Sequence, residues 1–304
     1  MKKIVLLLFA LLIGIGLVGC SGSEYITPDV LEVQFIPSGD ADVLDAQRLP
    51  LQNLLEAELG MDVNVTVATD YNALIEGMKS EKIHVGFLAS ASYVLAHDEG
   101  AAEVILKSLR YDVDDDGNLL EDAPMVAGYR SQLIAAAESG IEEVADLEGK
   151  TIAIASFTST SGFIWPANLL ADNGLDPETD VTWLDAGSHD GAVLAVINGQ
   201  ADAAFTYKDA RQRVVEDYPN VNELVVFVQN TELIPNDTIS VLPNLHPAIK
   251  YAVEKAFLAI AASEDGLEVI DALYSHLGYA PAQDSDYDIV RTYLARQEEW
   301  SFGE

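Results

Sequence analysis

The chain has 304 residues, 49% hydrophobic and 22% charged, which is typical of a globular protein long enough for two domains or lobes. Its 50 acidic residues against 16 basic ones give a formal net charge of −34. Such a charge excludes nucleic acid and anionic bilayer surfaces as partners of the folded body. We interpret the acidity itself as a well-solvated surface without a function of its own.

The N-terminus has the pattern of an export signal. Lys2 and Lys3 precede an apolar run over residues 4–18, which is short for a membrane span. The run closes with Leu17-Val-Gly-Cys20, similar to the end of a bacterial lipoprotein signal, in which the cysteine is diacylated and becomes the new N-terminus. An ordinary signal peptide and an anchor helix are the alternatives.

We therefore predict a signal peptide over residues 1–19, lipidation of Cys20 and a lipidated tether over 20–29. The folded protein is expected on the extracytoplasmic face of the cell membrane, in the periplasm or at the cell exterior. Cys20 is the only cysteine, so no intramolecular disulfide is possible.

Strand and helix patterns alternate in the first third of the chain. Gly60 ends one helical pattern and Asp70 precedes another as a predicted N-cap. The predicted strands cover residues 30–36, 63–67, 83–88 and 104–109, and the predicted helices cover 43–59, 71–79 and 90–97. This β-α-β-α-β-α-β order indicates a largely parallel sheet covered by helices.

An acidic stretch over residues 112–122 interrupts the alternation. Asp112, Asp114, Asp116 and Gly117 match positions 1, 3, 5 and 6 of a calcium-binding loop. The twelfth position, however, holds Ala123 where such a loop has a bidentate Glu. We therefore favour an acidic turn between two strands over a calcium site.

The remainder of the chain contains a second set of strand–helix units and a helical tail. Predicted strands cover residues 124–137, 151–155, 181–184, 201–206, 224–227 and 238–242, with an extended loop at 233–237. Predicted helices cover 142–147, 188–198, 246–263, 267–277 and 287–298. Two successive sets suggest two α/β lobes, with the tail returning to the first lobe.

The stretch from Thr151 to Leu170 joins a strand to a helix through a turn rich in hydroxyl groups. Its hydroxyl-bearing residues are Ser156, Thr158, Ser159, Thr160 and Ser161. Hydroxyls, free backbone N–H groups and the positive end of a helix dipole together favour an oxyanion. The alternative is a cluster that only caps the helix, but a cap needs one hydroxyl.

Four motifs in a fixed order resemble the periplasmic phosphonate/phosphite/phosphate-binding family of ABC importers. They are Ala68-Thr-Asp-Tyr71, Ser159-Thr-Ser-Gly162 followed by Phe163-Ile-Trp and Pro166, Gly187-Ser-His189-Asp with the segment to Asp202, and Leu233-Ile-Pro-Asn-Asp237. The resemblance implies a type II binding-protein fold, an α/β clamshell whose ligand lies between two lobes. It implies a first lobe over 30–127 plus 238–304, a second lobe over 128–237, and hinges where the chain crosses between them.

The same resemblance implies a set of ligand-binding residues. Ser159, Thr160 and Ser161 would grip the phosphoryl oxygens, His189 and Tyr71 would contact the ligand, Tyr129 would line the cleft, and Asp237 would face the ligand. Asp209 stands where aminoalkyl-phosphonate binders of the family have a Glu, and Phe87-Leu88 departs from the family's aromatic pair. Aminoethylphosphonate, phosphite, methylphosphonate and phosphate therefore all stay open as ligands.

Several of these residues also have ordinary structural roles as alternatives. His189 could cap the helix that starts near Ser188, Tyr71 and Tyr129 could be core residues, and Asp237 could be a turn residue. If they bind ligand, neutral hydroxyl and N–H donors satisfy the three oxygens without a Lys or Arg. A nearby dianion would favour protonated His189, and Asp237 would accept from a protonated ligand oxygen or an amine.

We expect no metal, no cofactor and no catalytic step. The histidines outside the motifs, His84, His97, His246 and His276, are too scattered for a metal site. The implied partners are an ABC permease and its ATPase, and the protein is expected to be a monomer. The rival interpretations are a binding protein that signals to a membrane receptor and a hydrolase that uses Ser, His189 and Asp. The second lacks a Gly-x-Ser-x-Gly elbow.

Overall fold

The computed structural model describes residues 25–120, 123–297 and 300. The predicted signal peptide and the lipidation site Cys20 lie outside the described residues. The end of the predicted tether docks on the fold, because Ile26 N–H donates to the carbonyl of Asn244 at 2.8 Å. Within the described ranges, no helix combines the length and the apolar character needed to span a bilayer.

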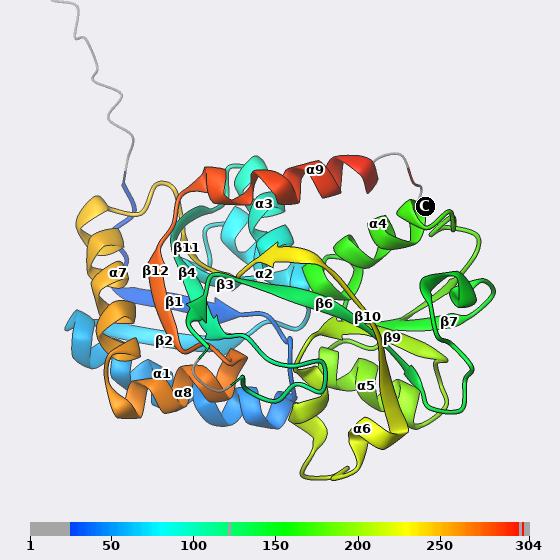
Figure 1. Ribbon diagram of the computed structural model, residues 1–304. Helices are drawn as coiled ribbons and strands as arrows, with labels where there is room; N and C mark the ends of the chain where they lie inside the picture. The colour runs from blue at the N-terminus through cyan, green and yellow to red at the C-terminus, as the bar shows by residue number, and fades with distance from the viewer. Residues whose placement is uncertain (1–24, 121–122, 298–299, 301–304) are drawn as a thin grey trace, which may run out of the picture.

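Two separate β-sheets form the centres of two lobes, and helices cover them (Figure 1). The first sheet contains β1 (Val30–Phe35), β2 (Asp62–Val67), β3 (Val85–Leu88), β4 (Glu103–Tyr111), β5 (Met125–Val126), β11 (Thr238–Val241) and β12 (Gly278–Pro281). The second contains β6 (Gly128–Ala136), β7 (Thr151–Ile154), β8 (Thr182–Asp185), β9 (Ala203–Tyr207) and β10 (Val225–Pro235).

The first sheet is mixed, although the four strands predicted in the first third of the chain all run in one direction, as expected. Its order is β12-β4-β11-β3-β1-β2, in which β1, β2, β3 and β4 share one direction and β5, β11 and β12 run opposite to them. Strand β11 returns from the second lobe and inserts antiparallel between β3 and β4, with Thr238 opposite both Leu88 and Lys107. The alternation along the sequence did not reveal this, because β4 has a strand from the far end of the chain as its neighbour.

The helices follow the apolar periodicity and end at recognisable caps. They are α1 (Ala41–Leu59), α2 (Tyr71–Lys79), α3 (Ser90–Asp98), α4 (Trp165–Asp172), α5 (His189–Ile197), α6 (Val221–Leu224), α7 (Pro247–Ala261), α8 (Glu264–Tyr274) and α9 (Asp288–Gln297). The Asp40 carboxylate accepts the N–H groups at the start of α1, and Gly60 closes that helix with φ of 65°. Asp70 caps α2 through the N–H of Ala73.

The second sheet has the order β10-β6-β9-β7-β8. Its two longest strands, β6 and β10, pair antiparallel from Val225 opposite Ala136 to Pro235 opposite Gly128. The predicted loop over 233–237 is therefore wrong in its first half, because β10 continues to Pro235. The chain crosses between the two lobes at one end of this strand pair, where Gly128 lies opposite Pro235 (Figure 1).

Helix α9 touches both lobes from one side. The Tyr293 ring stacks on Trp165 of α4 with centroids 4.1 Å apart, and the carbonyl of Tyr293 accepts from Asn168 Nδ2 at 3.1 Å. The same helix contacts α3 of the first lobe.

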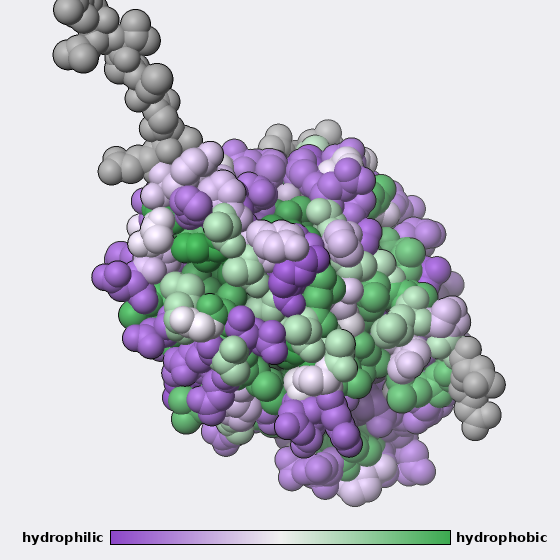
Figure 2. Space-filling model, turned by 90° about the vertical axis from the view of Figure 1, so that its left-hand side faces the viewer, coloured by the Kyte–Doolittle hydropathy of each residue, from purple (hydrophilic) through white to green (hydrophobic). Residues whose placement is uncertain are grey.

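Figure 2 shows the surface of the molecule on the side of the first lobe. Hydrophilic residues lie mainly along the margins of this face, and hydrophobic residues lie among them.

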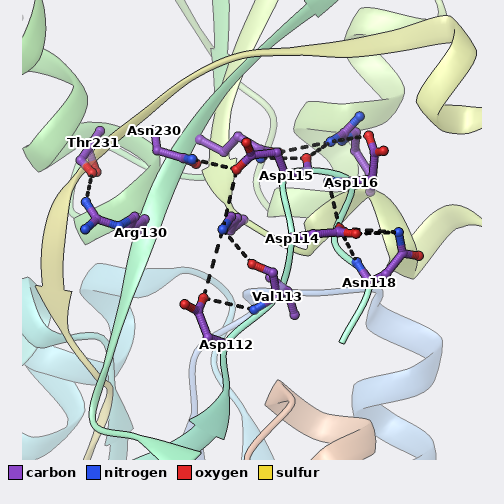
Figure 3. Close-up of polar contacts among 12 residues, drawn as sticks. Asp112, Val113, Asp114, Asp115, Asp116, Asn118, Arg130, Asn230 and Thr231 are labelled. Carbon is purple, nitrogen blue, oxygen red and sulfur yellow. Dashed lines mark hydrogen bonds and ion pairs between the residues drawn. The ribbon is translucent and has the colours of Figure 1, made fainter. Parts of the chain in front are cut away.

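The acidic stretch after β4 forms a turn, as predicted, and this turn reaches onto the second lobe (Figure 3). Gly117 adopts φ of 84°, and a Cβ there would lie 3.2 Å from Cα of Asp209. Lys208 Nζ donates to the Val113 carbonyl at 2.6 Å and lies 3.4 Å from Oδ1 of Asp115. Side chains that donate to the Asp115 or Asp116 carbonyl or carboxylate come from Gln132, Arg211, Gln212, Asn222 and Asn230.

We call residues 112–118 with these partners the inter-lobe clasp. Several of its acidic groups face basic or amide side chains of the second lobe. Among the described residues, no group of three or more His, Cys, Asp or Glu side chains is arranged to hold a metal ion.

Candidate functional site

A small cavity lies between the two lobes. Its volume is about 30 Å³, counted over the positions that the centre of a water molecule can take. This is room for roughly two or three water-sized groups. Its lining residues are Ile36, Ser38, Tyr71, Ala89, Arg110, Tyr129, Ser159, Ser161, His189, Tyr207, Asp237 and Tyr274. Both lobes contribute, and polar groups predominate among these residues.

The turn after β7 supplies two serines to the cavity. The Ser159 hydroxyl accepts the Gly162 N–H at 3.1 Å, and the Ser159 carbonyl accepts from Phe163 and Ile164. The helix therefore starts earlier than predicted, with a π-helical turn over Thr160–Ile164 that continues into α4. The first N–H groups of a helical segment have no acceptor within the helix, which leaves those of Thr160 and Ser161 pointing out of it.

Gly162 is required by this turn. A Cβ at that position would lie 2.9 Å from the Ser159 Oγ and 3.2 Å from the backbone N of Ala155. A side chain at position 162 would therefore collide with the Ser159 side chain that lines the cavity.

His189 enters the cavity as the first residue of α5. Ser188, and not His189, caps this helix, because its hydroxyl accepts the Gly191 N–H at 3.0 Å. The ring Nε2 of His189 lies 3.3 Å from the Ser159 Oγ, and the backbone N–H of His189 donates to the Ser38 carbonyl of the first lobe at 3.0 Å. Burial lowers the pKa of His189 to about 4, although Asp237 and Asp209 act in the opposite direction. The imidazole is therefore neutral at neutral pH.

Two tyrosines approach the serines from other elements. Tyr71 begins α2 and is almost fully buried, and Tyr129 lies at the start of β6. Burial raises the pKa of both phenols, and Asp237 raises them further, while hydrogen bonds with the Ser159 and Ser161 hydroxyls act against this. Both phenols are therefore protonated and available as hydrogen-bond donors.

Asp237 lies on the short connection between β10 and β11. Its side chain is 29% exposed, and Oδ2 lies 3.8 Å from Nε2 of His276. Its Oδ1 is buried, as is the Nδ1 of His189, and neither atom has a hydrogen-bond partner among the described residues. Nine buried side-chain atoms lack a hydrogen-bond partner among the described residues, and these two are the ones whose residues line the cavity.

Six of the eight predicted binding residues line the cavity, and Thr160 and Asp209 do not. The Thr160 hydroxyl accepts the Ala91 N–H at 2.8 Å and lies 3.2 Å from the Ser90 hydroxyl, so it ties the turn to α3 of the first lobe. The Asp209 carboxylate is bound to Arg110, whose Nη2 lies 2.5 and 2.6 Å from its two oxygens.

The sequence analysis missed Ser38, Arg110, Tyr207 and Tyr274 as lining residues. Arg110 is the most consequential, because the predicted site contained no Lys or Arg. It is the last residue but one of β4, and Ser38 lies three residues beyond the end of β1. In α/β sheets, ligands bind beyond the carboxyl ends of the strands. Both residues lie near such an end, so their positions could have indicated them as candidate site residues.

The fold and the inter-lobe cavity define the class of two-lobed extracytoplasmic substrate-binding proteins. The structure resembles a binding protein of a phosphonate ABC transporter from Pseudomonas aeruginosa, with a TM-score of 0.77, 22% identity and coverage of 90% of this chain and 87% of the other. It also resembles PhnD1 of Prochlorococcus marinus, solved in complex with methylphosphonate, with a TM-score of 0.77 and 17% identity over 90% of this chain and all of that one.

Proteins of related sequence belong to the same class. The phosphate-import protein PhnD of Mycolicibacterium smegmatis is 27% identical over 90% of this chain and 89% of its own length. The phosphonates-binding periplasmic protein of Escherichia coli is 27% identical over 81% of this chain and 70% of its own length. The family of periplasmic substrate-binding proteins of phosphonate ABC transporters matches residues 33–287, and the chain belongs to that family.

Proposed function

We propose that the inter-lobe cavity captures a small phosphorus oxyanion, such as methylphosphonate, phosphite or phosphate. The observation that carries this proposal is the meeting of serine and tyrosine hydroxyls with two partnerless buried atoms, His189 Nδ1 and Asp237 Oδ1, around one small space. Hydroxyl and N–H donors can satisfy several oxygens of a tetrahedral ligand in fixed directions.

Each residue has a role in this arrangement. Ser159, Ser161, Tyr71 and Tyr129 donate to the oxygens of the ligand, and neutral His189 donates from one ring nitrogen. Asp237 accepts a hydrogen bond from a protonated ligand oxygen, because two unprotonated oxygens would repel each other. The relatives support the ligand class: one is named a phosphate-import protein, and one was solved with methylphosphonate.

The proposal extends to the way the ligand is delivered. The first lobe (30–127 plus 238–304) and the second lobe (128–237) close on the ligand as a clamshell and present it to an ABC permease with its ATPase. The acylated Cys20 would hold the monomeric protein at the extracytoplasmic face of the membrane. Membership of a transport-protein family supports delivery over the alternative, a ligand sensor for a membrane receptor.

A hydrolase would need more than the pair of Ser159 and His189. In a catalytic triad, an acid accepts from the histidine Nδ1–H and orients the ring. Here the Nδ1 of His189 has no hydrogen-bond partner among the described residues. This observation favours binding without a chemical step.

Calorimetric titration with methylphosphonate, phosphite, phosphate and 2-aminoethylphosphonate tests the proposal. At least one of the first three should bind below roughly 0.1 mM, a binding free energy of about −5.5 kcal/mol. Absence of binding by all four would overturn the proposed ligand class. Asp237→Asn separates the role of the carboxylate, because it should weaken ligands that carry a protonated oxygen. Undiminished affinity of this variant at every pH would disprove that role.

A further inference from the structure

We propose that Arg110, held in place by Asp209, determines which phosphorus oxyanions enter the cavity. It admits those whose remaining substituent is small and uncharged and rejects those that carry an ammonium group. This inference rests on the proposed function, because it concerns the substituent of the ligand bound there.

Arg110 is fixed at the cavity wall on several sides. Its side chain is only 11% exposed, and its Nη2 donates to both oxygens of Asp209. Its guanidinium carbon lies 5.7 Å from the ring centroids of Tyr129 and of Tyr207, a distance at which a cation is attracted by an aromatic face. The guanidinium therefore places a positive charge at the wall of the cavity.

Both carboxylate oxygens of Asp209 accept from this arginine. Its Oδ2 also lies 3.3 Å from the Ser275 hydroxyl, and the backbone of Gly117 in the inter-lobe clasp packs against its Cα. Asp209 is not among the residues that line the cavity, while Arg110 is. The carboxylate therefore lies behind the guanidinium, where a ligand ammonium would have to displace Arg110 to reach it.

The charges at the wall set the selectivity. The other charged residue at the wall, Asp237, accepts from a protonated ligand oxygen in the proposed function, so an ammonium on the substituent would be left beside the buried guanidinium. Like charges at short range repel strongly where water is excluded. Displacing Arg110 from Asp209 to make room for the ammonium is also costly, because it leaves the buried guanidinium without its partner. A hydrogen, hydroxyl or methyl substituent meets neither penalty. Rejection through repulsion, in addition to attraction of the favoured ligand, is a general source of specificity.

Exchange of the arginine tests the inference. Wild-type protein, Arg110→Gln and the double variant Arg110→Gln/Asp209→Asn are titrated with methylphosphonate, 2-aminoethylphosphonate and propylphosphonate, which has nearly the shape of the amine without its charge. Wild type should bind methylphosphonate at least about tenfold more tightly than 2-aminoethylphosphonate. Arg110→Gln exposes Asp209 and should gain at least about tenfold in affinity for the amine relative to propylphosphonate, and the double variant should lose that gain.

The control is Arg296→Gln, which removes an arginine that pairs with Asp172 at 2.6 Å, away from the residues that line the cavity. This variant should keep the wild-type ligand order. An Arg110→Gln protein that melts cooperatively but gains no affinity for the amine overturns the inference, as does a wild type that prefers the amine. Failure of wild type to bind any phosphorus oxyanion instead overturns the proposed function, so the two failures are distinguishable.

Discussion

The Oγ of Ser159 lies 3.3 Å from Nε2 of His189, and each of these residues stands at the start of a helix that follows a strand of the second sheet. Strands β7 and β8 are parallel neighbours, so their carboxyl ends lie at the same edge of the sheet. The turn after β7 brings the serine there, and the turn after β8 brings the histidine. Two motifs that are separate in the sequence thereby become one half of the cavity.

Ser159→Ala should lose both a ligand contact and a helix cap. Loss of a hydrogen bond to a charged ligand should weaken binding of methylphosphonate by about 10- to 100-fold, from about 1.5–3 kcal/mol. Loss of the bond from Gly162 N–H should lower the free energy of unfolding by about 1 kcal/mol. Calorimetry measures the first effect, and chemical denaturation measures the second.

The matched control is Ser263→Ala. Ser263 caps α8 through the Gly266 N–H at 3.1 Å, the distance of the corresponding bond at Ser159. It should reproduce the loss of stability and leave binding unchanged. Equal affinities of the two variants would remove Ser159 from the ligand site.

His189 should make the fold less stable in acid. Its pKa is about 4 in the folded protein, lowered by burial, and about 6.5 in an unfolded chain. The unfolded state therefore binds the proton first as pH falls, and stability present above pH 6.5 is lost towards pH 4, by on the order of 2–3 kcal/mol. His189→Gln should remove this part of the pH dependence, measured by denaturation between pH 4 and 7.5. His246→Gln, at the exposed start of α7, should retain it.

The sequence analysis located much of the first lobe and six of the twelve residues that line the cavity, because local patterns determine them. Helix α2 has the predicted bounds, since Asp70 caps it and its apolar spacing ends at Lys79. Arg110 was missed for a different reason. Its position at the end of a predicted strand could be read from the sequence, but its role depends on Asp209, 99 residues away, and on the insertion of β11 beside β4, and neither leaves a periodic signal in the sequence. Thr160 was assigned to the ligand by its place in the Ser-Thr-Ser motif, and its hydroxyl contacts the neighbouring lobe.

Asp190 should have the opposite pH dependence from His189, next to it. Burial raises the pKa of its carboxyl to about 6, while a hydrogen bond from Asp40 N–H at 2.7 Å acts against this. The folded state therefore binds the proton before the unfolded state, whose Asp has a pKa near 3.9, and stability falls as pH rises through 6. Asp190→Asn, which keeps an acceptor for Asp40, should be more stable than wild type above pH 6 by roughly 1–3 kcal/mol.

The gain of Asp190→Asn should disappear as pH approaches 4, where the wild-type carboxyl is protonated in the folded protein. Asp265→Asn serves as the control, because Asp265 is the second residue of α8 as Asp190 is of α5, but it is exposed. It shares any interaction with the helix dipole and lacks the burial. Denaturation curves at pH 4, 5, 6 and 8 distinguish the two, and a constant difference across this range would contradict the assigned cause.

The inter-lobe clasp should stabilise the closed arrangement of the lobes. Lys208 of the second lobe donates to the Val113 carbonyl of the clasp at 2.6 Å and lies 3.4 Å from Asp115. These contacts cross between lobes, so separation of the lobes would break them unless the clasp moved with the second lobe. Each also holds the segment that follows Arg110, and so the wall of the cavity.

Lys208→Met should therefore favour an open form of the ligand-free protein. Lys250→Met is its control. Lys250 donates to the Pro243 carbonyl at 2.7 Å and to Glu103 at 2.6 Å, both within the first lobe. Its side chain is 15% exposed, similar to the 13% of Lys208. Both variants should lose comparable stability, but only Lys208→Met should increase the radius of gyration without ligand and weaken methylphosphonate binding, by roughly two- to tenfold, since less of the protein is closed. Small-angle scattering and calorimetry measure these effects. If the two variants have the same radius of gyration and the same affinity, the clasp does not control closure. The lobes would then separate without breaking the contacts of the clasp.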